Sequence, residues 1–86
     1  MKIRRATQQE VSSYEGLYPL YGTVQVSGHT VYIEHLPGDP DFEIMIPNGF
    51  IHKPDCLHSL ICVDMEDLQD RLNLLDIQPC RCEECK

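Results

Sequence analysis

The amino-acid sequence predicts a small α+β protein, in which a mostly antiparallel sheet of about four strands is covered on one face by a C-terminal helix. Three observations lead to this fold class. Apolar and polar residues alternate on both sides of Gly28 and His29, further short runs are separated by Pro/Gly turns, and one helical pattern closes the chain. Sequential short strands joined by tight turns pair antiparallel by default.

The N-terminal residues predict two short elements. Met1 to Arg5 can form an edge strand. Thr7 and Glu10 have the spacing of a capping box, in which each side chain satisfies a free amide at the start of a helix. A short helix from Gln8 to about Tyr14 follows, and we expect Gly16 to end it.

The next segment, Tyr14 to Tyr21, reads YEGLYPLY. Pro19 excludes a continuous helix, so the segment is expected to lie extended or turning across the sheet. Two interpretations stay open: a lid over the core, or an exposed aromatic patch of the kind enriched at binding surfaces.

The strongest pattern runs from Tyr21 to Leu36. Its two alternating halves predict a β-hairpin, with Gly28-His29 as a two-residue loop. Glycine in the first place of such a loop favours a type II′ turn.

Two further strands follow. Phe42 to Ile46 alternates again between the turn signals of Pro37–Asp41 and Pro47–Gly49. Phe50 and Ile51 then lead into a polar loop from His52 to Asp55. Within Leu57 to Val63, the last four residues are an unbroken apolar run, which suits a strand buried on both faces.

A C-terminal helix is predicted from Met65 to about Leu75. Asp64 can cap it, and Glu66 and Asp67 lie in the first turn, where the helix dipole favours negative charge. The apolar stripe that would cover the sheet consists of Met65, Leu68, Leu72 and Leu75. We expect Pro79 to stop the helix, so that residues 1–79 form one domain and 80–86 a Cys-rich tail.

The net charge of −7 is concentrated in one part of the chain. Residues 39–76 contain nine carboxylates against Lys53 and Arg71, whereas the segments on either side balance. A field of this sign repels phosphate backbones. We therefore expect no direct nucleic-acid binding, and a partner protein with a basic surface.

Six carboxylates are candidates for contacts with that partner: Glu66, Asp67 and Asp70 on the polar face of the helix, and Glu43, Asp39 and Asp41 on a strand and its adjoining turn. Glu34 can extend the second group. The alternative for the helix is a solvated face whose acids compensate the dipole.

The cysteines suggest a metal site. Cys80, Cys82 and Cys85 form C-x-C-x-x-C, and thiolates at this spacing can reach one tetrahedral Zn²⁺. The fourth ligand is expected from Cys56 or His52. Such an ion would fold the tail back onto the domain and stabilise a chain with a small core. A reduced, solvent-exposed tail is the alternative.

A cytoplasmic location is expected. The chain has no apolar run long enough to cross a bilayer, and no apolar stretch follows its N-terminal charges. The five cysteines are odd in number and crowd at the C-terminus, which does not suit a secreted disulfide scaffold.

Together these features favour a small acidic protein that acts by protein–protein interaction, as an inhibitor or adaptor docking on a basic partner such as a nucleic-acid-binding protein. Phage-type inhibitors offer an analogy. Two alternatives stay open: a zinc-stapled structural or adaptor module without an inhibitory role, and a small enzyme using Cys56 and His58. No orienting third group accompanies that pair, so enzyme activity is not expected.

Overall fold

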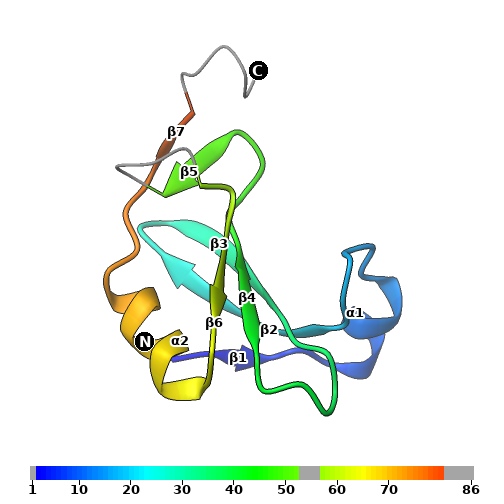
Figure 1. Ribbon diagram of the computed structural model, residues 1–86. Helices are drawn as coiled ribbons and strands as arrows, with labels where there is room; N and C mark the ends of the chain where they lie inside the picture. Colours follow the sequence, from blue (N-terminus) through cyan, green and yellow to red (C-terminus); the bar gives the residue numbers. More distant parts are fainter. Residues whose placement is uncertain (1, 53–56, 81–86) are drawn as a thin grey trace.

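The structure, a computed structural model, describes residues 2–52 and 57–80. Within them the chain forms a five-stranded antiparallel sheet, a two-stranded sheet and two helices (Figure 1). The elements are β1 (Arg4–Arg5), α1 (Gln8–Ser13), β2 (Leu20–Val26), β3 (His29–Glu34), β4 (Phe42–Met45), β5 (Phe50–His52), β6 (Ser59–Cys62), α2 (Met65–Asn73) and β7 (Ile77–Pro79). The α+β class is confirmed. The main sheet has five strands where about four were expected, and its edge strand β1 lies within the predicted segment from Met1 to Arg5. The two-stranded sheet was not expected.

The five-stranded sheet has the order β1-β2-β3-β4-β6, and every neighbouring pair is antiparallel. The predicted hairpin is β2–β3, but its loop was placed one residue too late. Val26 pairs with His29, so the loop is Ser27-Gly28. Ser27 has φ 51° and Gly28 φ 81°. Two left-handed residues make a type I′ turn, not type II′.

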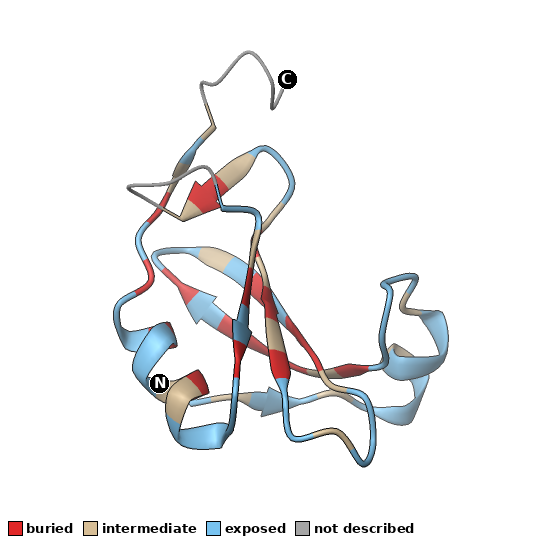
Figure 2. Cartoon of the chain, in the orientation of Figure 1, coloured by how far each residue is buried: buried red, intermediate tan, exposed pale blue. Residues whose placement is uncertain are grey.

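The core lies between this sheet and α2. Successive residues along the strands alternate between the face toward α2, which is buried, and the opposite face, which we call the open face (Figure 2). The buried strand residues are Val24, Val26, Val31, Ile33, Phe42, Ile44, Leu60 and Cys62, and they pack with Leu68 and Leu72 of α2. In Figure 1, α1 lies on the other side of the sheet from α2.

β6 is an edge strand with only one buried face. Leu60 and Cys62 belong to the core, whereas Ile61 is 62% and Val63 is 63% exposed. The prediction of a strand buried on both faces is therefore wrong. The unbroken apolar run places Ile61 on the open face, where no described element covers it.

α2 begins as predicted and ends earlier. The Asp64 carboxylate accepts a hydrogen bond from the Asp67 amide at 2.8 Å, which confirms the N-cap. The helix ends at Asn73, so Pro79 does not stop it as expected. Instead Ile77–Pro79 form β7 against β5. A continued helix would turn Ile77 half a turn away from Leu68. An extended segment instead brings Leu75 and Ile77 into the core.

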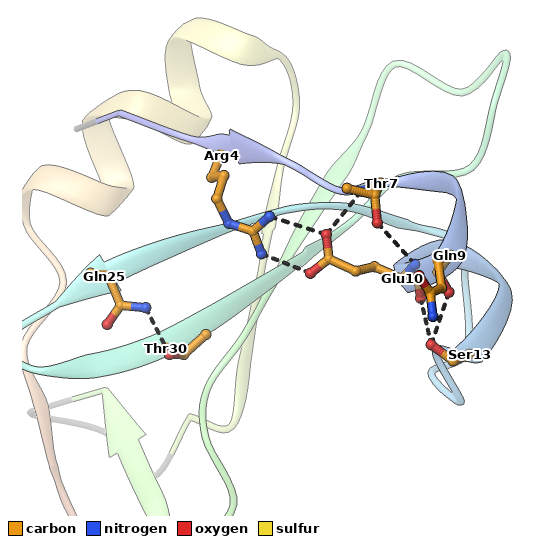
Figure 3. Close-up of polar contacts among 7 residues, drawn as sticks. All are labelled: Arg4, Thr7, Gln9, Glu10, Ser13, Gln25 and Thr30. Carbon is orange, nitrogen blue, oxygen red and sulfur yellow. Dashed lines mark hydrogen bonds and ion pairs between the residues drawn. The ribbon is translucent and has the colours of Figure 1, made fainter.

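α1 is a short helix fixed by the predicted capping box (Figure 3). The Glu10 amide donates to Thr7 Oγ1 at 3.2 Å, and the Thr7 amide donates to the Glu10 carboxylate at 2.9 Å. Arg4 of β1 forms an ion pair with the same carboxylate at 2.7 Å. The helix ends at Ser13 with Tyr14 extended, so Gly16 does not end it as expected.

The segment from Tyr14 to Tyr21, which leads from α1 into β2, combines both interpretations of its sequence. Leu20 is buried, whereas Leu17 is 80% exposed. The Tyr14 ring lies against the Tyr32 ring of the open face, with centroids 5.8 Å apart. The segment therefore crosses one end of the open face and leaves the remainder uncovered by described residues.

Candidate functional site

A pocket lies at the end of the open face where β3 turns into β4. Its volume is about 100 Å³, enough for the end of one side chain and too small for a drug-sized ligand. The lining residues are Tyr18, Glu34, His35, Leu36, Asp39, Asp41, Phe42, Glu43 and Ile61. Four of them are carboxylates, and we call this site the acidic pocket.

Strand register places three of the lining residues in one row. Glu34 of β3 is directly opposite Glu43 of β4, and Glu43 is directly opposite Ile61 of β6. Side chains that are directly opposite in an antiparallel pair share a face, with Cβ atoms about 4.5–5.5 Å apart. The row therefore brings two carboxylates together beside an exposed apolar side chain.

The β3–β4 turn supplies the other two carboxylates. The Asp39 amide donates to the Leu36 carbonyl at 3.0 Å, and Gly38 has φ 90°, as the third residue of a type II turn requires. The Asp41 amide donates to the Asp39 carboxylate at 2.9 Å. His35 Nε2 lies 2.6 Å from the Asp39 carbonyl oxygen. These bonds hold both aspartates beside the row.

Glu34 is a buried carboxylate, only 1% exposed. It accepts a hydrogen bond from the Tyr14 hydroxyl and one from the Tyr18 amide at 3.3 Å. Both donors are neutral. Among residues 2–52 and 57–80, no lysine, arginine or histidine forms an ion pair with it. The Glu34 carboxylate is therefore stabilised by the dipoles of a hydroxyl and an amide, and no basic side chain among the described residues neutralises its charge.

The neighbours of Glu34 respond to this charge. Burial, and then repulsion from Glu34, raise the pKa of the half-buried Glu43. Burial and the hydrogen bond to Glu34 also raise the pKa of Tyr14 well above its usual range. Both shifts have the sign expected for a site that lacks positive charge.

The six predicted partner-binding carboxylates separate into two groups. Glu43, Asp39 and Asp41 line the acidic pocket together. Glu66, Asp67 and Asp70 lie on α2, which packs against the opposite face of the sheet.

Asp67 also has a local structural role. Its carboxylate accepts a hydrogen bond from the Val63 amide at 3.0 Å and forms an ion pair with Arg71 at 3.2 Å. These bonds lower the pKa of Asp67, with the Val63 amide as the largest cause. This carboxylate is therefore partly neutralised and less suited to bind a partner.

Sequence reasoning named Glu34 but missed its burial and its two tyrosine contacts. The missing information was register: the Glu34–Glu43 pairing depends on the length of the β3–β4 turn. Once that register is known, the alternation of the two strands places both carboxylates on one face.

The predicted zinc ligands lie mostly outside the described residues, which exclude Cys56, Cys82 and Cys85. Cys80 follows β7, and its amide donates to the Gly49 carbonyl at 2.9 Å. His52 pairs with Ile77 at the other end of the small sheet, three residues away from Cys80, or about 10 Å along the strand. The structure therefore does not bring His52 and Cys80 together.

No group of three or more His, Cys, Asp or Glu side chains in the described part of the chain could hold a metal ion. His52 Nδ1 already accepts a hydrogen bond from the Asp76 amide at 3.0 Å. The zinc site stays a prediction. So does the Cys56–His58 pair, because Cys56 is not among the described residues.

No protein-family model, curated protein or solved structure matches this chain. Neither described helix has the length and apolar character needed to cross a bilayer.

Proposed function

We propose that the protein acts by binding another protein, and that the acidic pocket receives a lysine or arginine side chain from a basic surface of that partner. The observation that carries this proposal is the buried charge of Glu34, which no described cation neutralises, beside the opposed carboxylate of Glu43. A bound cation would offset the cost of burying the Glu34 carboxylate and the repulsion between Glu34 and Glu43.

The rest of the pocket suits such a side chain. Lysine and arginine carry an apolar stem below a charged end. Ile61, Leu36 and Tyr18 line the pocket and are exposed, so they offer apolar surface to the stem. The carboxylates of Asp39 and Asp41 lie beside the charged end, and arginine can bond carboxylates through two parallel hydrogen bonds.

The charge of the whole chain supports the same kind of partner. A net charge of −7 attracts basic proteins over a distance and speeds their association. Basic surfaces are common on proteins that bind nucleic acids, because they must neutralise phosphates. We propose the role of an inhibitor or adaptor that covers such a surface, with phage-type inhibitors as the analogy.

Affinity capture with two matched variants tests the proposal. The pocket variant carries Glu43→Gln and Asp39→Asn, and the control carries Glu66→Gln and Asp70→Asn on α2, so each loses two negative charges. Quantitative mass spectrometry compares the proteins captured by the wild type and both variants. We expect a basic partner that the control retains and the pocket variant loses by at least tenfold.

Equal capture by the wild type and the pocket variant, with both folded by circular dichroism, would contradict the proposal. Loss of the partner only in the α2 control would assign binding to Glu66 and Asp70. A partner insensitive to both variants and to added salt would exclude a charge-based interface of either kind.

A further inference from the structure

We infer that the partner contributes an extended segment, which adds as a strand to the outer edge of β6 and places a lysine or arginine opposite Ile61. This inference rests on the proposed function and specifies how the partner reaches the acidic pocket. It follows from the free edge of the sheet, from the direction of the backbone groups of β6, and from the row that leads to Glu34.

β6 ends the five-stranded sheet. It pairs with β4 on one side, and within residues 2–52 and 57–80 no strand pairs with its other side. Natural edge strands are usually protected from pairing by being very short, or by lysine, proline, a bulge or a covering element. The residues of β6 are Ser59, Leu60, Ile61 and Cys62, which include neither lysine nor proline. Just before β6, the Leu57 carbonyl accepts a hydrogen bond from the His52 amide at 3.0 Å, so β5 occupies the outer edge at that position. Within the described residues, the outer edge of β6 itself, from Ser59 to Cys62, is left open to a short further strand.

The ladder shows which backbone groups of β6 point outward. The Ile46 amide donates to the His58 carbonyl at 2.9 Å, so these two residues form a hydrogen-bonded pair. Such pairs alternate along an antiparallel ladder, so Leu60 and Cys62 also bond to β4. Ser59 and Ile61 lie between them and direct their amides and carbonyls to the outer edge.

The next outward position supports this assignment. By the same alternation the Val63 amide points outward, and it donates to a side chain, the Asp67 carboxylate, at 3.0 Å. The chain therefore satisfies this outward donor itself. No described residue accepts a hydrogen bond from the Ile61 amide in this way. The exposed side chain of Ile61 lines the acidic pocket.

The row of side chains explains why the segment would carry a basic residue. A residue paired opposite Ile61 would extend the row Glu34, Glu43, Ile61 by one strand, about 4.8 Å further out. Its side chain would stand on the open face, with Ile61 between it and Glu43. Lysine and arginine are long enough to cross Ile61 and bring their charge to the carboxylates, with their stems on its apolar surface.

The same charges disfavour a second copy of this chain as the occupant. Two molecules paired through β6 would bring their acidic pockets together, and each molecule has a net charge of −7. Like charges brought together oppose association. Charge complementarity therefore selects a basic segment of a different protein.

A defined peptide tests the inference on the full chain. The probe is a blocked seven-residue peptide of alternating threonine and valine with a central arginine, and its control has glutamine in place of the arginine. Nuclear magnetic resonance of the ¹⁵N-labelled protein follows both titrations. We expect the arginine peptide to bind about tenfold more tightly or better, as a charge-assisted hydrogen bond provides. We also expect slower hydrogen exchange at the Ser59 and Ile61 amides.

Two substitutions at the edge separate pairing from pocket binding. Ile61→Pro removes the outward amide while leaving the bonds of Leu60 and Cys62 to β4, because proline is tolerated where the strand N–H faces outward. Ile61→Thr keeps the amide and a β-branched side chain, and serves as the matched control. We expect the proline variant to lose at least tenfold in affinity and the threonine variant to stay within about threefold.

The outcomes distinguish the two proposals. Arginine-dependent binding that Glu43→Gln abolishes, without any change at the Ser59 and Ile61 amides, overturns strand addition and leaves the proposed function standing. If both peptides slow hydrogen exchange at those amides equally, and Glu43→Gln leaves this slowing unchanged, the result supports edge pairing. The same result excludes a role for the acidic pocket in binding the peptide. Binding of neither peptide at millimolar concentration overturns the inference. If Ile61→Pro fails to fold, hydrogen exchange in the wild-type chain alone decides.

Discussion

Glu34 and Glu43 stand directly opposite each other across β3 and β4, and among the described residues no basic side chain forms an ion pair with either. Like charges in this position destabilise a sheet. The protein therefore holds an unfavourable pair of charges within the acidic pocket, which four carboxylates line.

Glu43→Gln is expected to stabilise the isolated protein at pH 7 by about 0.2–1 kcal/mol, because it removes a like charge from a cross-strand pair. The pKa of Glu43 is raised above its ordinary value of 4.5, so the folded state binds its proton more tightly than the unfolded state. Its ionisation therefore lowers stability at neutral pH, and this effect disappears as the pH falls toward 4.5. Urea unfolding of the wild type and the variant at pH 7 and pH 4 measures the gain in stability and its loss at low pH.

Asp70→Asn is the control, because Asp70 is exposed on α2 and such changes usually stay within about 0.5 kcal/mol. A Glu43→Gln protein that is less stable than the wild type at pH 7 would contradict the assigned repulsion. Combined with the capture experiment, this substitution separates folding from binding, since we expect it to stabilise the fold and weaken the complex.

Tyr14→Phe is expected to destabilise the protein by about 1–3 kcal/mol, because it removes one of the two donors to a buried carboxylate. Tyr18→Phe provides the comparison, since Tyr18 bonds Glu34 through its backbone amide, which the substitution keeps. Denaturant midpoints of the two variants measure the difference. Equal stability of both variants would exclude an energetic role for the Tyr14 hydroxyl.

Glu10 is expected to titrate far below the ordinary glutamate value of 4.5. The hydrogen bond from Arg4, followed by the Thr7 amide, lowers the pKa of Glu10 to about 2. Its contribution to stability is thus fully present above its unfolded value of 4.5 and is lost as the pH falls toward 2. Carbon-13 chemical shifts of the side chain measure the pKa, and Arg4→Gln should raise it. An unchanged titration in that variant would contradict the ion pair.

Leu72→Ala and Leu74→Ala form a matched pair on one helix. Leu72 is fully buried, whereas Leu74 is 77% exposed. We expect the first substitution to cost about 2–5 kcal/mol, because it opens a cavity between α2 and the sheet. The second should change stability by less than about 0.5 kcal/mol. Similar losses for both would mean that α2 packs through a different face.

The zinc hypothesis predicts a bound ion in the natively purified chain. Native mass spectrometry should then show the mass of one Zn²⁺, and a chelator should lower the melting temperature, because metal binding contributes folding free energy. A double substitution, Cys82→Ser with Cys85→Ser, should abolish both effects, whereas Cys62→Ala should leave the metal content unchanged, since Cys62 lies in the core. A metal-free native mass would remove the hypothesis.

Features set by neighbouring residues were predictable from the sequence. The capping box of Thr7 and Glu10 and the Asp64 cap each depend on side chains within one turn of helix, and both are confirmed. The β2–β3 hairpin was predictable for the same reason, since alternation on both sides of a glycine indicates it. Its loop was not, because serine at a positive φ carries no strong sequence signal.

Features set by distant residues were not predictable. β7 has only three residues, too few to show a period of two. Its partner β5 is equally short and ends at His52, where the sequence suggested that a polar loop begins. The exposure of Ile61 was missed because an apolar run does not reveal which face of a sheet stays uncovered. The acidic pocket was missed for a related reason, since it depends on the register of three strands.

The pairing of β5 with β7 ties residues 50–52 to residues 77–79. The stretch beyond α2 is thus a structural component and not an appendage. Cleavage by a protease after Asn73, or a fusion that displaced the C-terminal residues, would separate β7 from β5, its one described strand neighbour. Both Ile51 and Ile77, which are buried, would then be exposed to solvent. We expect this corner to open as a unit of its own, ahead of the larger sheet, and C-terminal truncations to reveal it first.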